Sequence, residues 1–337
     1  MMTFDFRSLT PYINDDLITD INYNGRELWL DHLDKGRFVD EGFIMDESVE
    51  KFCYRFANYA NVPFNVANPI VESESEAIRI SIIHESVAKS GYSISIRKTP
   101  AVLRLKRSDM TKKHYASSEL LDLLEQLVKS HCNILVCGLP GAGKTELVKY
   151  LTTFIPSNER VITIEDTLEI HYANINTHKD SVELKVNQHF SYVDAIKASL
   201  RQRPNWLLLS EVRSHEVVQL LEAVSTGAKL ISTIHADTAT NIPSRLLHMF
   251  PGVELSNKMI LESIYESIDI GIHVSSNITD NGITRQINEV IYYEYTSNME
   301  TKQYVIYTSN EGIKQIPESL QKKLSFTPKK VGRKKKC

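Results

Sequence analysis

The sequence of 337 residues has no long apolar run and few cysteines, and each absence excludes a class of protein. No stretch approaches the roughly 18 consecutive apolar residues of a membrane-spanning helix. The N-terminal segment MMTFDFRSLT carries an acid and lacks the apolar core of a secretory signal. The four cysteines form neither a metal-ligand spacing nor a disulfide framework: Cys53, Cys132, Cys137 and Cys337. We therefore expect a soluble, cytoplasmic protein.

Acidic and basic residues nearly balance, but their distribution along the chain is uneven. The net charge is −3, yet residues 322–336 contain eight basic residues and no acid, which leaves −11 for the remainder. Two interpretations of this basic tail stay open. It is a solubilising, disordered end, or it contacts anionic lipid or nucleic acid, and salt would weaken either contact.

The order of strand and helix patterns predicts two domains. Residues 1–107 combine short strand patterns with an amphipathic helix over 46–60, which indicates a mixed α/β domain. Residues 108–118 are polar and lack apolar periodicity, so we expect a linker there. Over 119–300, strand-like apolar runs alternate with helical patterns, as is typical of a parallel sheet flanked by helices. Residues 301–337 are predicted to add a strand and the disordered basic tail.

A phosphate-binding loop is the strongest motif in the sequence. The apolar strand pattern Asn133–Cys137 leads directly into GLPGAGKT, which starts at Gly138, and a helical pattern follows. The motif GxxxxGK[ST] between a strand and a helix binds the phosphates of a nucleoside triphosphate. Its glycines let backbone N–H groups curl around phosphate oxygens. Lys144 supplies a charge for the β and γ phosphates, and the hydroxyl of Thr145 is a ligand for Mg²⁺.

Three further strand patterns each end in side chains that are able to do chemistry. They are 161–164, followed by Glu165, Asp166 and Glu169; 206–209, followed by Glu211; and 230–234, followed by His235. Because the carboxyl ends of parallel strands meet at one edge of a sheet, we expect these residues beside the phosphate loop. One acid would hold Mg²⁺, directly or through water, and another would orient or deprotonate the attacking water. Taken singly, the acids could instead cap helices, and the histidine could be structural.

The order of these motifs resembles that of the secretion ATPase superfamily, the traffic ATPases of type II and type IV secretion and of pilus assembly and retraction. The corresponding segments are the phosphate loop Gly138–Thr145, an aspartate box Ile162–Glu169, a Walker B segment Leu200–Arg213 and a histidine box Ser232–Ala239. The resemblance covers about residues 9–295 and is similar in detail to VirB-type and CpaF-type members. It implies an α/β fold, with an N-terminal mixed α/β domain and a C-terminal RecA-like P-loop NTPase domain whose sheet is mainly parallel.

The resemblance also implies a role for each matching residue. ATP and Mg²⁺ would be the cofactors, with Glu169 as catalytic base, Glu211 holding Mg²⁺ through water and His235 contacting the γ-phosphate. Arg79 and Arg97 of the N-terminal domain would close over the nucleotide. The nucleotide-binding set in the loop is Gly138, Pro140, Gly141, Ala142, Gly143, Lys144, Thr145 and Glu146.

The expected machine is a homo-oligomeric ring, most simply a hexamer, that works on an inner-membrane platform or coupling protein from the inner face of the membrane. The sequence departs from the family pattern at Asn205, Ser210 and Ala228. These departures keep open a nucleotide-gated assembly switch with little turnover. A RecA-like nucleic-acid motor and a small-molecule kinase also stay open as functions, since a phosphate loop alone does not identify the acceptor.

Overall fold

The fold was analysed in a computed structural model, which describes residues 4–75, 77–250, 256–279 and 282–325. The chain divides into two compact units. The N-terminal unit is Met1–Ala101 with Asn277–Thr284, and the C-terminal unit is Val102–Ser276 with Arg285–Cys337. The expected boundary of the two domains at 107 stays a prediction.

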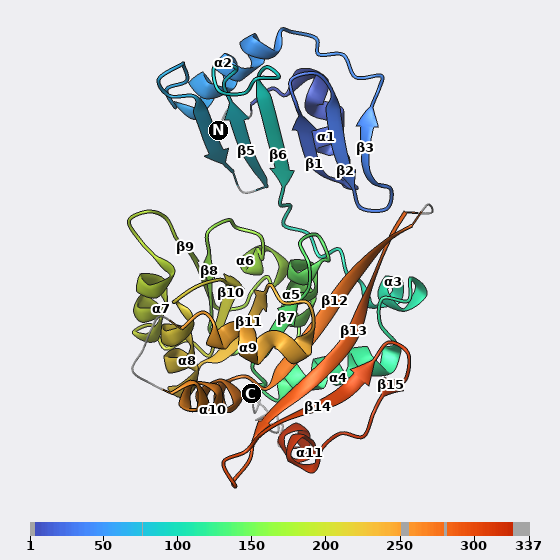
Figure 1. The fold of residues 1–337 in the computed structure, drawn as a ribbon, viewed down its shortest axis with the longest axis vertical. Coiled ribbons are helices and arrows are strands. Elements are labelled where there is room, and N and C mark those ends of the chain that lie inside the picture. The colour runs from blue at the N-terminus through green and yellow to red at the C-terminus, as the bar shows by residue number, and fades with distance from the viewer. Residues whose placement is uncertain (1–3, 76, 251–255, 280–281, 326–337) are drawn as a thin grey trace, which may run out of the picture. The chain divides into compact units, whose positions relative to one another are not determined.

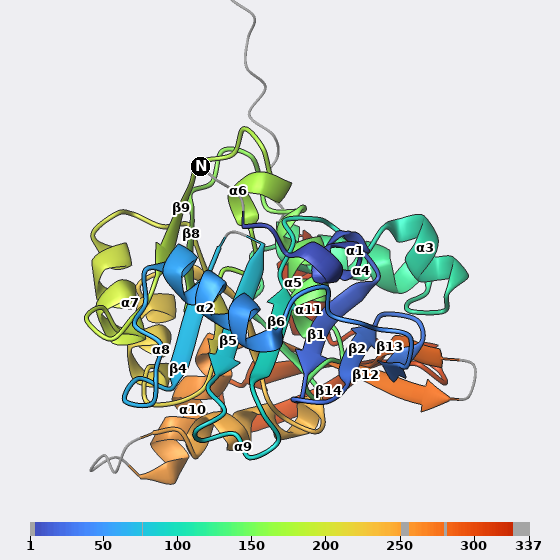
Figure 2. The same ribbon diagram turned by 90° about the horizontal axis from the view of Figure 1, so that it is seen from above.

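The N-terminal unit is built on a six-stranded sheet with the order β3-β2-β1-β6-β5-β4. Every strand pair in it is antiparallel. Figure 2 shows helix α2 lying across this sheet, and the two share one hydrophobic core. The elements are η1 Arg7–Leu9, α1 Thr10–Asn14, β1 Ile18–Tyr23, β2 Leu28–His32, β3 Gly36–Asp40, α2 Val49–Ala60, β4 Ile70–Glu74, β5 Ile78–Ile83 and β6 Ser93–Lys98.

One face of this sheet is apolar and the other is polar, as the alternation in its strands predicts. In β6, Ile94 and Ile96 are buried beneath α2, whereas Ser95 and Arg97 between and beyond them are exposed. A period of two places alternate side chains on opposite faces of a sheet. Helix α2 is preceded by Ser48, whose hydroxyl accepts a hydrogen bond from the N–H of Lys51 and so caps the helix.

The C-terminal unit contains a nine-stranded sheet with the order β15-β14-β13-β12-β7-β11-β10-β8-β9. The run from β12 to β9 is parallel, and β14 pairs antiparallel with both β13 and β15. Figure 1 shows β12, β13 and β14 as long strands on one side of the unit. The strands are β7 Ile134–Cys137, β8 Val161–Glu165, β9 Ser181–Lys185, β10 Trp206–Val212, β11 Lys229–Ile234, β12 Ile270–Thr279, β13 Gly282–Tyr295, β14 Thr301–Thr308 and β15 Gly312–Ile313.

Helices cover both faces of the parallel strands, so successive side chains of one strand enter two different cores. In β7, Ile134 and Val136 belong to the core shared with α4 and α5, while Leu135 and Cys137 belong to the core shared with α7 to α10. Such double burial is typical of parallel sheets. The helices are α3 Arg107–Lys112, α4 Ser118–Lys129, α5 Lys144–Thr152, α6 Tyr172–Ile175, α7 Tyr192–Leu200, α8 Val217–Ser225, η2 Ala239–Asn241, α9 Ile242–Leu247, α10 Asn257–Ser267 and α11 Glu318–Ser325.

The mixed α/β fold with its mainly parallel second sheet confirms the predicted fold class. The segment expected to be a linker contains most of helix α3, and its residues Met110 and Tyr115 are buried in the C-terminal core, while its role as a linker stays a prediction. These two apolar residues are too few to give the segment a helical period, which explains why it reads as a linker. Residues 326–337 of the basic tail lie outside the described residues. Within the described ranges, none of the helices has the length and apolar character needed to cross a membrane.

Candidate functional site

The phosphate loop joins the end of β7 to the first turn of α5, and its backbone depends on glycine. Gly138, Gly141 and Gly143 have φ angles of 148°, 76° and 93°, a region that favours glycine. At Gly138 a Cβ atom would also lie 2.2 Å from the carbonyl oxygen of Val274 in the neighbouring strand β12. Ala142 is fully buried, so it anchors the loop to the core below it. The sequence has small residues where this conformation requires them.

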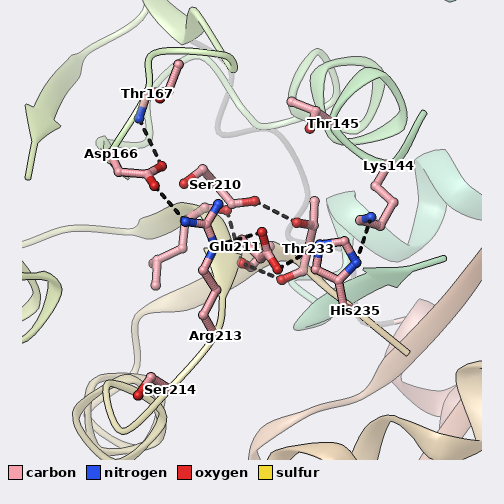
Figure 3. A network of polar contacts seen from close by, with 12 residues as sticks. Lys144, Thr145, Asp166, Thr167, Ser210, Glu211, Arg213, Ser214, Thr233 and His235 are labelled. Carbon is pink, nitrogen blue, oxygen red and sulfur yellow. Dashed lines mark hydrogen bonds and ion pairs between the residues drawn. The ribbon is translucent and has the colours of Figure 1, made fainter. Parts of the chain in front are cut away.

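Lys144 begins α5 and turns its side chain back over the loop. Its Nζ donates to the carbonyl oxygens of Gly138, at 3.0 Å, and Leu139, at 3.2 Å, and lies 3.4 Å from Nδ1 of His235. Burial lowers the pKa of Lys144, and the negative charges of Glu211 and, more weakly, Glu169 oppose that shift. Figure 3 shows the side chain pointing toward His235. The acceptors that hold the lysine are thus neutral carbonyl oxygens and a histidine ring nitrogen.

Thr145 connects the loop to the acidic segment that follows β8. Its hydroxyl donates to Oε2 of Glu169 over 3.1 Å. Glu169 is in turn positioned by Glu165, because Oε2 of Glu165 accepts from the backbone N–H groups of Glu169, at 2.9 Å, and Ile170, at 3.0 Å. Glu165 is fully buried, and burial raises its pKa to about 7 although the backbone donors oppose the shift. A buried acid therefore shapes the loop that presents Glu169.

Glu211 lies between a histidine and an arginine at the end of β10. Its Oε1 is 3.1 Å from Nε2 of His235, and its Oε2 accepts from Nε of Arg213 over 2.8 Å. Arg213 also donates through Nη1 to Oδ2 of Asp166 over 2.6 Å (Figure 3). If Nε2 of His235 carries the proton, Nδ1 is free to accept from Lys144. These contacts form a continuous polar chain across three strand ends and the phosphate loop.

The structure brings together five of the predicted residues: Lys144, Thr145, Glu169, Glu211 and His235. A cavity of about 460 Å³ opens beside them. It is lined by Gly138, Leu139, His235, Ala236, Asp237, Asn241, Ser244, Arg245 and His248. Free space therefore adjoins the start of the loop and the histidine.

Other predicted residues lie outside this group of side chains. Glu146 points to Lys149, whose Nζ is 3.0 Å from Oε1 of Glu146, and Pro140 is exposed on the loop. Arg79 and Arg97 belong to the N-terminal unit, where they stand opposite each other on β5 and β6. Their expected contact with the nucleotide stays a prediction.

Sequence reasoning missed two residues that touch the site. The hydroxyl of Tyr192 contacts Asp166 and Ser210, and Arg285 donates from Nε to the carbonyl oxygen of Gly141 over 3.3 Å. It expected Glu165 beside the loop, but not its hydrogen bonds to the Glu169 segment. Tyr192 and Arg285 come from elements far along the chain and carry no motif. Glu165 stands inside the expected aspartate box, but only its complete burial distinguishes it from its neighbours.

Comparison with protein families identifies the chain. Residues 68–272, more than half of the sequence, match the model of the family described as type II/IV secretion system protein. The chain belongs to this family. The matched segment includes strands β4, β5 and β6 and the C-terminal unit as far as the start of β12, with the phosphate loop, the acids and the histidine described above.

Individual proteins are also similar to this chain. An uncharacterised protein of Bacillus anthracis is 28% identical over 281 residues, which cover 82% of this chain but 63% of that protein. The chain therefore spans less than two thirds of that relative. The type IV secretion system protein VirB11 of Bartonella quintana is 36% identical over 129 residues, or 37% of this chain and 36% of its own length. The ATPase DotB of Yersinia pseudotuberculosis shares the fold, with a TM-score of 0.66, 17% identity and coverage of 88% and 81% of the two chains.

Proposed function

We propose that this protein is the Mg²⁺-dependent, ATP-hydrolysing motor of a type IV secretion, conjugation or pilus-like machine. The observation that carries the proposal is the polar chain in the C-terminal unit, where Lys144 meets His235 and Glu211 beside a glycine-dependent loop. Membership of the secretion family supports it, as do a relative named as a type IV secretion protein and a similar structure named as an ATPase.

The residues around the loop fit a magnesium ion. The hydroxyl of Thr145 and the carboxylates of Glu169 and Glu211 are oxygen donors of the kind that Mg²⁺ prefers. Among the described residues, no three His, Cys, Asp or Glu side chains form a cage for a metal ion. A partial ligand set is what Mg²⁺ uses beside a nucleotide, because phosphate oxygens and waters complete its shell. When bound, the ion would neutralise charge developing on the phosphates.

The side chains suggest how ATP is bound. In our proposal Nζ of Lys144 leaves the carbonyl oxygens of Gly138 and Leu139 and binds phosphate oxygens instead. This exchange is favourable because charged acceptors bind an ammonium group more strongly than carbonyl oxygens do. The N–H groups of the loop and of the first turn of α5 would bind the remaining phosphate oxygens. His235 would contact the γ-phosphate, because its Nδ1 lies beside Lys144, which would bind the same phosphate.

The contact between Thr145 and Glu169 suggests how hydrolysis is coupled to binding. Glu169 now accepts a hydrogen bond from Thr145. If the hydroxyl of Thr145 were a ligand of the metal, Glu169 would lose this donor and its carboxylate would be available as base toward the attacking water. Glu211 would keep its place through Arg213 and hold the metal through water. Glu169 would thus act as a base only when nucleotide and Mg²⁺ are bound.

At the level of the assembly, we propose a homo-oligomeric ring, most simply a hexamer. The N-terminal unit would move with the nucleotide state, since only differential contact with two states biases a conformation. Arg79 and Arg97 are the proposed nucleotide contacts of that unit. The partner would be an inner-membrane platform or coupling protein, reached from the cytoplasmic face, and the basic tail would add contact with anionic lipid or nucleic acid.

Phosphate release from ATP by the purified full-length protein tests the proposal. We expect Mg²⁺-dependent release that falls by about 10²-fold or more in Lys144→Ala, because the phosphates lose their mobile charge. The matched control is Lys197→Ala, an exposed lysine of α7, and it should leave the rate unchanged. Equal rates in Lys144→Ala and the native protein would contradict the proposal.

A second candidate is a nucleotide-gated assembly switch with little turnover. It is favoured by Ser210, which stands beside Glu211 and departs from the family pattern. Binding of a fluorescent ATP analogue at one per chain, together with ring formation but no steady-state phosphate release, would select the switch over the motor.

A further inference from the structure

Strand β10 is irregular at the point where it presents Glu211. Its pairing with β11 is regular through Leu209 opposite Ser232 and then shifts, so that Val212 stands opposite Ile234. Leu209 and Val212 consequently enter the same core, although three residues of a regular strand would place them on opposite faces. An extra residue of this kind is a β-bulge, which redirects side chains. Ser210 and Glu211 lie within the irregularity.

Tyr192 contacts the irregular segment through Ser210. Tyr192 begins helix α7, whose start is fixed by a capping box between Ser191 and Asp194. The hydroxyl of Tyr192 lies 2.8 Å from Oγ of Ser210 and 3.3 Å from Oδ1 of Asp166, and it accepts from the N–H of Asp166 over 3.1 Å. On the partner strand, the hydroxyl of Thr233 donates to the carbonyl oxygen of Ser210 over 2.7 Å.

The direction of these hydrogen bonds follows from the number of protons. Tyr192 has one hydroxyl proton, and its best acceptor is the carboxylate of Asp166. Ser210, which is 8% exposed, then donates its own proton to the tyrosine oxygen. Both hydroxyls therefore have hydrogen-bond partners, which favours this arrangement where water has little access.

Arg213 connects Asp166 to Glu211, so the position of Asp166 affects the position of Glu211. Burial alone would raise the pKa of Asp166, but Arg213 and the backbone N–H of Thr167 lower it below its ordinary value. Asp166 therefore stays charged and holds Nη1 of Arg213 at 2.6 Å, while Nε of the same guanidinium holds Glu211 at 2.8 Å. A planar guanidinium that bonds two carboxylates fixes the orientation of both.

We propose that Tyr192 and Ser210 are positioning residues for Glu211, acting through Asp166 and Arg213. This inference rests on the proposed function, in which Glu211 holds the metal of the nucleotide. Tyr192 touches neither the phosphate loop nor Lys144, so its loss would affect the placement of Glu211 and not the binding of phosphate. The hydroxyl of Ser210 contributes to the placement of Glu211 only while the hydroxyl of Tyr192 is present to accept its hydrogen bond.

The test uses Tyr192→Phe and Ser210→Ala in the full-length protein, with steady-state phosphate release measured over a range of ATP concentrations. We expect kcat to fall about fivefold to tenfold in Tyr192→Phe and about threefold in Ser210→Ala, while KM for ATP stays within about twofold. Since the two hydroxyls act in series, the double variant should be no slower than Tyr192→Phe alone. Ser210→Thr keeps the hydroxyl and should restore most of the rate.

Tyr307→Phe is the matched control, since Tyr307 is a buried tyrosine of β14 in the same unit, and it should leave kcat unchanged. The inference is overturned if the two substitutions have multiplicative effects, or if Tyr192→Phe lowers the melting temperature with kcat unchanged. A rise in KM alone would overturn it as well, because that pattern means lost nucleotide binding.

A second readout separates this inference from the proposed function. The Mg²⁺ concentration that gives half-maximal binding of a fluorescent, non-hydrolysable ATP analogue should rise about threefold in Tyr192→Phe. Binding requires no turnover, so this shift supports the inference even in a protein that does not hydrolyse ATP. An unchanged Mg²⁺ requirement in Tyr192→Phe overturns it. Absence of phosphate release from the native protein, by contrast, contradicts only the proposed motor.

Discussion

The two sheets of this protein differ in how completely their strands are buried. All four residues of β7 and all five of β8 in the C-terminal unit are buried. In the N-terminal unit, β2 and β6 alternate buried residues with exposed or partly exposed ones. The parallel sheet has helices on both faces, whereas α2 covers one face of the antiparallel sheet.

This difference determines where each unit can place functional groups. A strand buried on both faces has no room for a charged side chain along its length, so chemistry is confined to its ends. Glu165, Glu211 and His235 all stand at or just beyond such ends. The open face of the antiparallel sheet tolerates charge within a strand, and Arg79 of β5 and Arg97 of β6 are found there, each one residue from the end of its strand.

The largest expected effect concerns a strand-end residue of the buried sheet. Glu211→Gln should lower phosphate release by about 10³-fold, because it removes the charge proposed to hold the metal while keeping the shape of the side chain. Steady-state phosphate release measures this. Little change in melting temperature is expected, since the amide oxygen can still accept from Arg213.

The control for this substitution is Glu222→Gln, an exposed glutamate of α8. Its rate should equal that of the native protein. If the Glu211→Gln protein retains more than about a tenth of the native rate, Glu211 does not have its proposed role in hydrolysis. The end of β10 would then not be a catalytic position.

Neighbouring positions of a strand should respond differently in the two sheets. Leu207→Ala and Leu208→Ala should each destabilise the protein by about 3 kcal/mol, because these adjacent residues of β10 fill cores on opposite faces. In β6 we expect a similar loss for Ile94→Ala but less than about 0.5 kcal/mol for its exposed neighbour Ser95→Ala.

Urea unfolding of the four variants measures these free energies. The contrast between the sheets fails if one of the two leucine substitutions is harmless, or if Ser95→Ala costs as much as Ile94→Ala. Either result would mean that burial on both faces does not distinguish the parallel sheet.

Much of the fold could be predicted from the sequence because periodicity is a local property. The helical spacing of apolar residues over 119–129 predicts α4, and the apolar run over 133–137 predicts β7, which the structure confirms at Ser118–Lys129 and Ile134–Cys137. Helix α3 could not be predicted, because Met110 is buried by residues distant in sequence. The β-bulge of β10 left no sign either, since its cause is a pairing with β11.

The site divides in the same way. The phosphate loop could be predicted because one contiguous motif contains its glycines, Lys144 and Thr145, and the strand-end rule placed Glu169, Glu211 and His235 near it. Tyr192 and Arg285 could not, because their contacts join elements separated by many residues. Burial of Glu165 is likewise a tertiary property. The catalytic roles of all these residues stay predictions.

The buried acid at the end of β8 predicts a specific dependence of stability on pH. Glu165 has a pKa of about 7 in the folded chain against 4.5 as its ordinary value. Between these values the folded protein keeps a proton that the unfolded chain has lost, so the contribution of Glu165 to stability is full below pH 4.5 and disappears as the pH rises through about 7. We expect this residue to contribute a loss of about 2 kcal/mol between about pH 5 and about pH 7.5.

Urea unfolding at the two pH values measures the loss, and Glu165→Gln isolates it because glutamine does not titrate. The pH dependence of the variant should be smaller by about 2 kcal/mol. Glu183→Gln, which alters an exposed glutamate of the neighbouring strand β9, is the control and should keep most of the native dependence. Identical pH dependence in native protein and Glu165→Gln would show that the strand end is not protonated in the folded state.

The smallest expected effects come from the open face of the N-terminal sheet. Arg79 and Arg97 stand directly opposite each other, and Nε of Arg97 is 2.8 Å from Oδ1 of Asp20. Arg97→Ala loses this exposed ion pair but also relieves the repulsion between two like charges, so stability should change by less than about 1 kcal/mol.

Measurements of ATPase activity test the proposed role of Arg79 and Arg97 directly. If these arginines close over the nucleotide, Arg79→Ala and Arg97→Ala should each lower kcat/KM for ATP by about tenfold, since each removes one charge from the phosphates. Arg37→Ala in β3 is the control, because Arg37 forms a comparable exposed ion pair with Asp31 at 3.0 Å, and its kcat/KM should not change. Equal behaviour of the three variants would assign Arg79 and Arg97 to the same surface role as Arg37. The open sheet would then contribute no charge to catalysis, and the chemistry would belong to the strand ends of the buried sheet alone.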